Sequence, residues 1–210
     1  MINPKKLFSE KEHEMIKEAV HNAEMHTSGE IATMAVSSSD EYREGIVLSA
    51  VILVTILGIM FGIIFRQHTI WFFIPVAFIL YFPVYYFCRL YPSVTIIFTH
   101  GKRVKNAVQE RAVRAFYEKG LYRTSESNGI LIFISELEHK TWILGDKGIN
   151  ERISQDEWST IATTLAKGFQ HNRCEALCIA IASCGVILSQ HFPAVSHGAN
   201  ELSDDVLFDN

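Results

Sequence analysis

Two long uncharged stretches follow each other closely in the first half of this 210-residue chain. Residues 45–65 and residues 69–88 contain no Asp, Glu, Lys, Arg or His. An α-helix rises about 1.5 Å per residue, so each stretch is long enough to cross the roughly 30 Å hydrocarbon core of a bilayer. Hydrocarbon offers backbone groups no hydrogen-bond partner, so such stretches enter it as helices. The sequence therefore predicts a transmembrane helical hairpin over residues 45–91.

Only Arg66, Gln67 and His68 separate the two stretches. We therefore expect a tight turn, with both flanks of the hairpin on one side of the membrane. The alternative is a buried helical hairpin in a water-soluble protein, but soluble helices of this length without a charge are uncommon.

The positions of Lys and Arg near the helix ends predict the orientation. The turn carries Arg66 alone, whereas the flanks carry Arg43, Arg89 and the basic cluster Lys102, Arg103 and Lys105. The N-terminus has no apolar stretch typical of a cleaved secretion signal, and the four cysteines are not spaced like a disulfide framework or a zinc site. We expect an inner (cell) membrane protein with both termini and the soluble domain in the cytoplasm.

The charge distribution argues against a nucleic-acid partner. The formal net charge is −4, and residues 193–210 contribute acids without a single Lys or Arg, so the rest of the chain is balanced. We interpret the basic cluster Lys102, Arg103 and Lys105 as a contact with anionic lipid. Residues 193–210 are predicted to be a flexible acidic tail.

The flanks of the hairpin alternate between helix and strand. Ser9 and Ser154 each precede a Glu by three residues, which is the capping-box pattern of a helix start. Apolar stripes predict a helix ending at Gly120 and a packing helix over residues 175–191, whose apolar core is too short to cross a membrane. Three strands are predicted, at residues 30–37, 129–135 and 140–145. Together these elements predict a layered α/β domain.

The order of several motifs resembles the TPM domain family, and more closely its bacterial membrane-protein branch, in which two transmembrane helices split the domain. The motifs are His26–Ile31, Arg111–Phe116, Ser127–Ser135, Gly145–Ile149, Ser154–Trp158, Gln190–Pro193 and Asn200–Asp204. The resemblance implies a Rossmann-like α/β sandwich, made here of residues 1–44 plus 92–192 and interrupted by the hairpin. It also implies functions found among relatives: weak acid phosphatase activity, binding of divalent cations, and accessory roles beside membrane proteins.

Three acids are candidate ligands for Ca²⁺ or Mg²⁺, because ligands bind beyond the carboxyl ends of strands in α/β sheets and hard cations prefer carboxylate oxygens. They are Asp40, Asp146 and Asp156. Glu136 is excluded, because it lies at the opposite end of a β-hairpin from Asp146. Lys147 opposes a cation at Asp146, although it suits a phosphate. The other interpretation is that these acids are turn and helix-cap residues.

No hydrolase or nucleotide-binding motif occurs in the chain. Gly58 and Gly62 form a GxxxG pattern, which allows close helix packing in lipid, either within the hairpin or with another chain. We therefore expect a membrane-anchored binding or accessory module more than an enzyme. The alternative is a weak phosphatase assisted by a divalent metal.

Overall fold

The computed structural model describes residues 7–66, 70–124, 126–194 and 201–209, and the predicted turn at residues 67–68 lies outside them. The chain divides into two compact units. We call residues 1–39 with 105–210 the α/β unit, and residues 40–104 the helical unit. In sequence, the helical unit lies between strand β1 (Glu30–Val36) and residues 105–118 of helix α5 (Gly101–Glu118).

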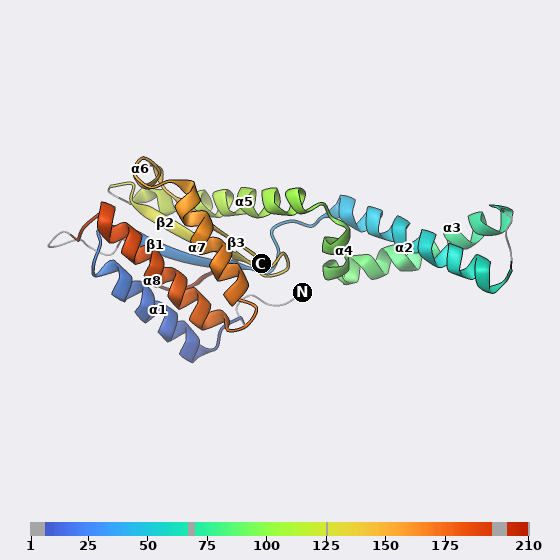
Figure 1. Cartoon of the computed structure of the whole chain (residues 1–210), viewed down its shortest axis with the longest axis horizontal. Helices are drawn as coiled ribbons and strands as arrows, with labels where there is room; N and C mark the ends of the chain where they lie inside the picture. The colour runs from blue at the N-terminus through green and yellow to red at the C-terminus, as the bar shows by residue number, and fades with distance from the viewer. Residues whose placement is uncertain (1–6, 67–69, 125, 195–200, 210) are drawn as a thin grey trace. The chain divides into compact units, whose positions relative to one another are not determined.

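The α/β unit is built on a mixed four-stranded sheet with the order β3-β2-β1-β4, in which β4 is Leu207–Asp209. Strands β1, β2 and β3 are labelled in Figure 1. Strands β1 (Glu30–Val36) and β2 (Gly129–Ser135) are parallel, and β3 (Lys140–Gly145) runs antiparallel to β2. The three strands predicted from the sequence are confirmed. Strand β2 is apolar at almost every position because helices cover both of its faces.

The two faces of the sheet carry separate cores. In β2, Ile130, Ile132 and Ile134 pack on one face against helices α1 (Glu10–Glu24), α7 (Gln155–Gly168) and α8 (Arg173–His191). Leu131 and Phe133 pack on the other face against α5 (Gly101–Glu118). The alternation follows from the two-residue period of a strand.

Helix α8 is the central packing helix predicted from the sequence. Leu177, Ile181 and Leu188 are fully buried along it. At Gly185, a Cβ atom would lie 2.8 Å from the Cβ of Ala23, so a glycine there lets α1 and α8 approach closely. The capping boxes expected at α1 and α7 both form: Glu12 accepts from the Ser9 N–H at 2.7 Å, and Glu157 accepts from the Ser154 N–H at 3.3 Å.

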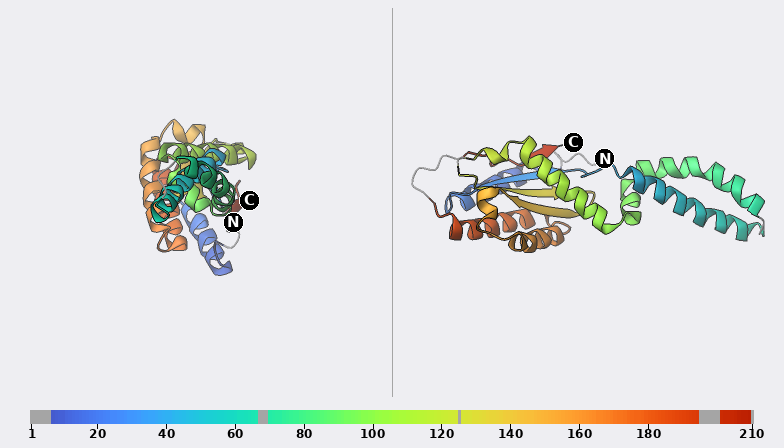
Figure 2. Two further views of the ribbon diagram at one scale, coloured as in Figure 1. Left: turned by 90° about the vertical axis from the view of Figure 1, so that its right-hand side faces the viewer. Right: turned by 90° about the horizontal axis from the view of Figure 1, so that it is seen from above.

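The helical unit contains the two predicted long helices, α2 (Arg43–Ile64) and α3 (Ile70–Leu90), followed by α4 (Pro92–Phe98). Helices α2 and α3 run side by side (Figure 2). A Cβ atom at Gly58 would lie 2.5 Å from the ring of Phe73. The absence of a side chain at Gly58 of α2 thus leaves room for the ring of Phe73 of α3.

Three helices of the described residues are long and apolar enough to cross a membrane: α2, residues 71–90 of α3, and α8. From the sequence, the apolar core of α8 is expected to be too short to cross a membrane. By length and composition α8 qualifies, but its buried residues pack against α1, α7 and the sheet.

The expectation of a flexible C-terminal tail is wrong for residues 201–209. Residues Leu207–Asp209 form β4, which pairs in parallel with β1. Val206 is buried, and the Glu30 carboxylate accepts the backbone N–H of Leu202 at 3.1 Å. Apolar residues between the acids drive this docking, and the composition argument overlooked them. Residues 195–200 lie outside the described residues.

Three short elements were not predicted: helix α4, helix α6 (Lys147–Asn150) and the 3₁₀ turn η2 (Leu121–Arg123). Each is too short to show a hydrophobic period. Gly120 has a φ of 70°, which fits its predicted place just past the end of a helix.

Candidate functional site

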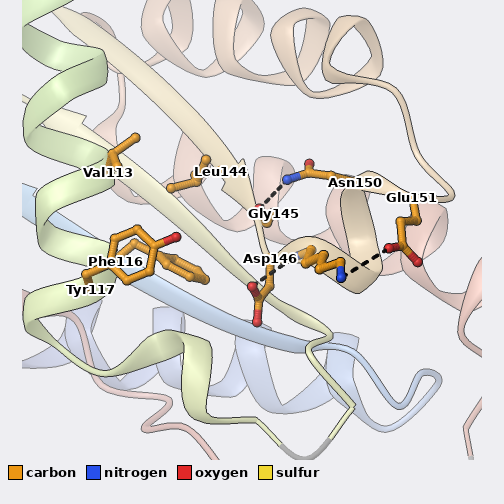
Figure 3. Close-up of a pocket in the computed structure, with 9 residues that line it drawn as sticks. Val113, Phe116, Tyr117, Leu144, Gly145, Asp146, Asn150 and Glu151 are labelled. Carbon is orange, nitrogen blue, oxygen red and sulfur yellow. Dashed lines mark hydrogen bonds and ion pairs between the residues drawn. The ribbon is translucent and has the colours of Figure 1, made fainter.

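A cavity of about 480 Å³ opens on the α/β unit beside the end of β3 (Figure 3). Gly145 at the end of β3 pairs with Ile130 near the start of β2, and the Asp146 N–H donates to the Gly129 carbonyl at 2.9 Å. The cavity therefore lies at the edge of the sheet where β2 begins. It is lined by Val113, Phe116, Tyr117, Leu144, Gly145, Asp146, Lys147, Asn150 and Glu151.

The segment from Gly145 to Gly148 shapes the polar part of this cavity. A Cβ atom at Gly145 would lie 2.5 Å from the side chain of Ile149, and one at Gly148 would lie 2.7 Å from the Ser127 carbonyl oxygen. Asn150 Nδ2 donates to the Gly145 carbonyl at 2.7 Å. Only glycine fits these two close approaches, so β3 passes into α6 through a tight, well-anchored turn.

Asp146 is the N-cap of α6, and its Oδ1 accepts the Lys147 N–H at 2.7 Å. Its Oδ2 is buried and has no hydrogen-bond partner among the described residues. Buried polar atoms normally have a partner, and one without a donor costs free energy. Asp146 is therefore the group in this cavity that a ligand with a donor would satisfy.

The remaining charges of the cavity are paired with each other. Lys147 Nζ lies 4.0 Å from Glu151 Oε1, and both side chains are exposed. In Figure 3, Glu151 lies on one side of Asp146, and the apolar side chains Val113, Phe116 and Leu144 lie on the other. The lining thus carries one negative charge in excess, on Asp146.

The opposite end of the sheet also holds buried carboxylates, but their partners are internal. Glu138 Oε1 accepts the Ser39 N–H at 2.8 Å, and Arg173 Nη2 lies 3.0 Å from Glu136 Oε1. Among the described residues, neither oxygen of Glu136 has a donor in hydrogen-bond geometry, and its charged partner is Arg173. The cavity there measures only about 10 Å³, too little for a ligand.

Among the described residues, the three predicted metal ligands are not part of any cluster that could hold a metal ion. Asp146 lies where β2 begins, whereas Ser39, which directly precedes Asp40, bonds to Ser135 at the end of β2. Six residue steps along a strand separate these ends by about 20 Å. Asp40 and Asp146 were both predicted to lie beyond the carboxyl ends of strands. Because β3 runs antiparallel to β1 and β2, its carboxyl end lies at the opposite end of the sheet from theirs.

Each of the three acids also has a local role. Arg103 forms an ion pair with Asp40 within the helical unit. Burial is the largest single influence on Asp40 and opposes its ionisation. The hydrogen bond and charge of Arg103, together with hydrogen bonds from the backbone N–H groups of Glu41 and Tyr42, outweigh burial and lower the pKa of that carboxyl. Asp156 is exposed in the first turn of α7. Within the described ranges, no three His, Cys, Asp or Glu side chains are close enough together to hold a metal ion.

A second group of carboxylates was missed by the sequence analysis. Glu24 accepts the Ile31 N–H at 2.7 Å, and burial raises the pKa of Glu24 to about 8. Burial likewise raises the pKa of Glu30, which holds the backbone of the docked C-terminal segment. Asp204 from that segment adds further negative charge beside both groups. The position of Glu30 was a possible signal for this group, because it places a carboxylate at the first residue of a strand that is buried throughout.

Comparison with known proteins gives two matches. The family model of the TPM domain matches residues 94–179. A solved structure, the NMR structure of BA42 protein from the psychrophilic bacteria Bizionia argentinensis sp. nov., has 21% sequence identity and a TM-score of 0.60. The similarity covers 96% of this chain and 95% of that one, and at this identity it shows the fold alone. No curated protein matches the chain. Residues 94–179 thus match a TPM domain, as the motif order indicated, and the whole chain shares a mixed α/β fold with BA42 protein.

Proposed function

We propose that this chain is a membrane-anchored binding protein without catalytic activity. Helices α2 and α3 form the anchor, inserted into a Rossmann-like α/β sandwich. The α/β unit binds its ligand or partner in the cytoplasm. The observation that carries the proposal is the exposed surface of α2 and α3, which is made of large apolar side chains. They include Val47, Leu48, Val51, Ile56, Ile59, Ile63, Trp71, Ile74, Phe78, Ile79 and Phe82.

The polar groups of α2 support this assignment. Ser49 Oγ donates to the Gly45 carbonyl at 2.6 Å, and Thr55 Oγ1 donates to the Val51 carbonyl at 2.8 Å. Both hydroxyls are satisfied within their own helix, as a hydrocarbon environment requires. Among the described residues of the helical unit, the ion pairs lie near the start of α2, where Arg103 Nε lies 2.9 Å from Glu44 Oε1. This pattern suits a span that ends in the interface.

Contacts within the helical unit occupy some of the residues that the sequence predicted to contact a protein partner or lipid. Because Phe73 fills the surface at Gly58, we propose that the GxxxG pattern of Gly58 and Gly62 serves packing within the hairpin. Because Arg103 pairs with Asp40 and Glu44, the proposed anionic-lipid contact falls mainly to Lys102 and Lys105.

Binding is favoured over catalysis by the side chains available. Burial raises the pKa of the Cys174 thiol to about 11 and raises that of Cys178, so neither thiol is an effective nucleophile at neutral pH. The alternative, a metal-assisted acid phosphatase, needs Asp40 and Asp146 at one reacting phosphate. The separation of the two sheet ends gives that alternative no support.

Membrane fractionation and labelling test the proposal. The full chain should stay with the membranes after an alkaline wash and be released by detergent. In intact bacterial cells, an impermeant maleimide should label Arg66→Cys, whereas it should label Lys167→Cys only after the inner membrane is opened. The unsubstituted chain controls for the four native cysteines. Release by the alkaline wash, or labelling of Lys167→Cys in intact cells, would contradict the proposed anchor or its orientation.

A further inference from the structure

The volume and the lining of the cavity beside Asp146 indicate the chemistry of a ligand that would fit it. Its volume of about 480 Å³ falls in the range of small-molecule sites, which is roughly 300–1,000 Å³. Most of the lining that comes from α5 and β3 is apolar or aromatic: Val113, Phe116, Tyr117 and Leu144. A ligand that fills this part must bring an apolar or aromatic stem.

The polar part of the cavity favours a positive group. Asp146 Oδ2 has no donor in the described part of the chain, and the Lys147 ammonium is already beside Glu151, so the excess charge of the lining is negative. An N–H group of a ligand at Asp146 would form a charge-assisted hydrogen bond. The aromatic rings of Phe116 and Tyr117 add favourable surroundings for a cation.

An anion such as a phosphate would find few donors at the same place. The Lys147 N–H donates to the Asp146 side chain, and the Gly148 N–H donates to the Ser127 carbonyl at 3.1 Å. Both backbone groups that a phosphate would use at this turn are therefore occupied. A bare metal ion is also disfavoured, because Asp146 has no second and third acidic, His or Cys ligand in the part of the chain that the structure describes.

We propose that this cavity binds a small organic cation, a protonated amine or guanidinium on an apolar or aromatic stem, with Asp146 as the group that receives it. The proposal rests on the proposed function, since it names the ligand class of the binding unit. The two can fail separately. The anchor is tested by membrane partition, and the cavity by ligand binding to the purified chain.

Benzylamine is a suitable probe, because it joins a protonated amine to an aromatic ring. The full chain in detergent micelles is titrated by calorimetry at neutral pH, with empty micelles as the blank. Benzyl alcohol keeps the ring without the charge, and benzoate reverses the charge. We expect benzylamine to bind at least tenfold more tightly than either.

Asp146→Asn removes the charge but keeps a residue that caps a helix, so α6 should remain folded. It should weaken benzylamine binding by about ten- to hundredfold, as expected for the loss of a hydrogen bond to a charged group. Asp156→Asn, at an exposed acid outside the cavity, is the matched control and should bind as the parent does. Glu151→Gln frees Lys147 and should weaken binding by a smaller factor.

Three results would overturn the proposal. One is equal affinity for benzylamine and benzyl alcohol, which would show that only the apolar part matters. The second is unchanged binding by Asp146→Asn in a variant that melts at the parent temperature. The third is the absence of any benzylamine binding up to millimolar concentration.

Discussion

Helices α2 and α8 are alike in length and apolar composition but differ in what surrounds them. Both are apolar enough to cross a membrane, yet 22% of the apolar window of α2 is buried against 44% for α8. Leu177, Ile181 and Leu188 of α8 pack into the core with α1, α7 and the sheet, whereas most large side chains of α2 are exposed outside its contacts with α3 and α4. Apolar composition therefore identifies a helix that avoids water. It does not show whether that helix is surrounded by lipid or by a protein core.

The two helices can be compared directly at isoleucine positions. Ile59 on α2 and Ile179 on α8 are both 55% exposed, and Ile181 on α8 is fully buried. Three isoleucines thus sample a surface proposed to face lipid, a surface facing water and a packed core. Substitutions at these positions separate the three environments.

The largest effect is expected from Ile181→Ala. Truncation of a fully buried isoleucine leaves a cavity and should lower the free energy of unfolding of the α/β unit by about 2–5 kcal/mol. Chemical denaturation followed by the fluorescence of buried Trp158 measures it. Ile59→Ala is the control and should change this transition by less than about 0.5 kcal/mol. Equal effects of both variants would remove the difference between the two helices.

The next largest effect is expected from a charge on the proposed lipid surface. Ile59→Lys places an ammonium within α2 and should oppose membrane insertion by about 2.5–3.5 kcal/mol. Ile179→Lys places the same group at an equally exposed position of α8 and should leave insertion unchanged. The fraction of chain that resists an alkaline wash is the measurement. If Ile59→Lys inserts as well as the parent does, α2 does not face hydrocarbon.

A change of pH should affect the α/β unit through Glu24. Its pKa is near 4.5 in the unfolded chain and about 8 in the fold, so the folded state holds a proton that the unfolded state releases. The stabilisation is complete below about pH 4.5 and is lost as the pH rises to about 8. After allowance for partial exposure, we expect a loss of about 2 kcal/mol.

Glu24→Gln is the test of this pH dependence. The amide stays neutral, so the variant should lose less stability than the parent between pH 5 and about pH 8. Urea denaturation at several pH values gives the comparison. Parallel curves for variant and parent would mean that Glu24 is not the titrating group. A matching fall in α2 insertion would show that the effect is not confined to the α/β unit.

The smallest effect is expected at the start of α1, the helix that packs against α8. Ser9→Ala removes the side chain that caps α1 and should cost about 1 kcal/mol of stability. Ser9→Asp retains an accepting oxygen and should restore most of the loss. Thermal melting resolves the series. No difference between Ala and Asp at this position would mean that the cap does not help to hold α1 on α8.

The elements of the α/β unit were predictable because their signals are local. The apolar run of β2, the capping boxes at Ser9 and Ser154, and Gly120 after α5 each act within a few residues. The TPM match over residues 94–179 agrees with the motif order for the same reason. The length of α2 and α3 followed from uncharged runs alone.

The candidate site was predictable only in part. Asp146 was singled out, and it does line a cavity. Its grouping with Asp40 required knowing which edge of the sheet each strand end meets, and that depends on the antiparallel pairing of β3. The docking of β4 on β1 joins residues more than 170 positions apart, and no local pattern marks it.

The sequence by itself therefore determined the longer helices and the strands β1, β2 and β3, and which of their faces are apolar, because these properties depend on side chains a few positions apart. The tertiary structure alone decided that α8 enters a core, that residues 207–209 add a strand to the sheet, and that Asp146, beside a cavity, has an oxygen without a partner among the described residues. The physical reason is that burial and hydrogen bonding depend on contacts between distant segments, which form only when the chain has folded.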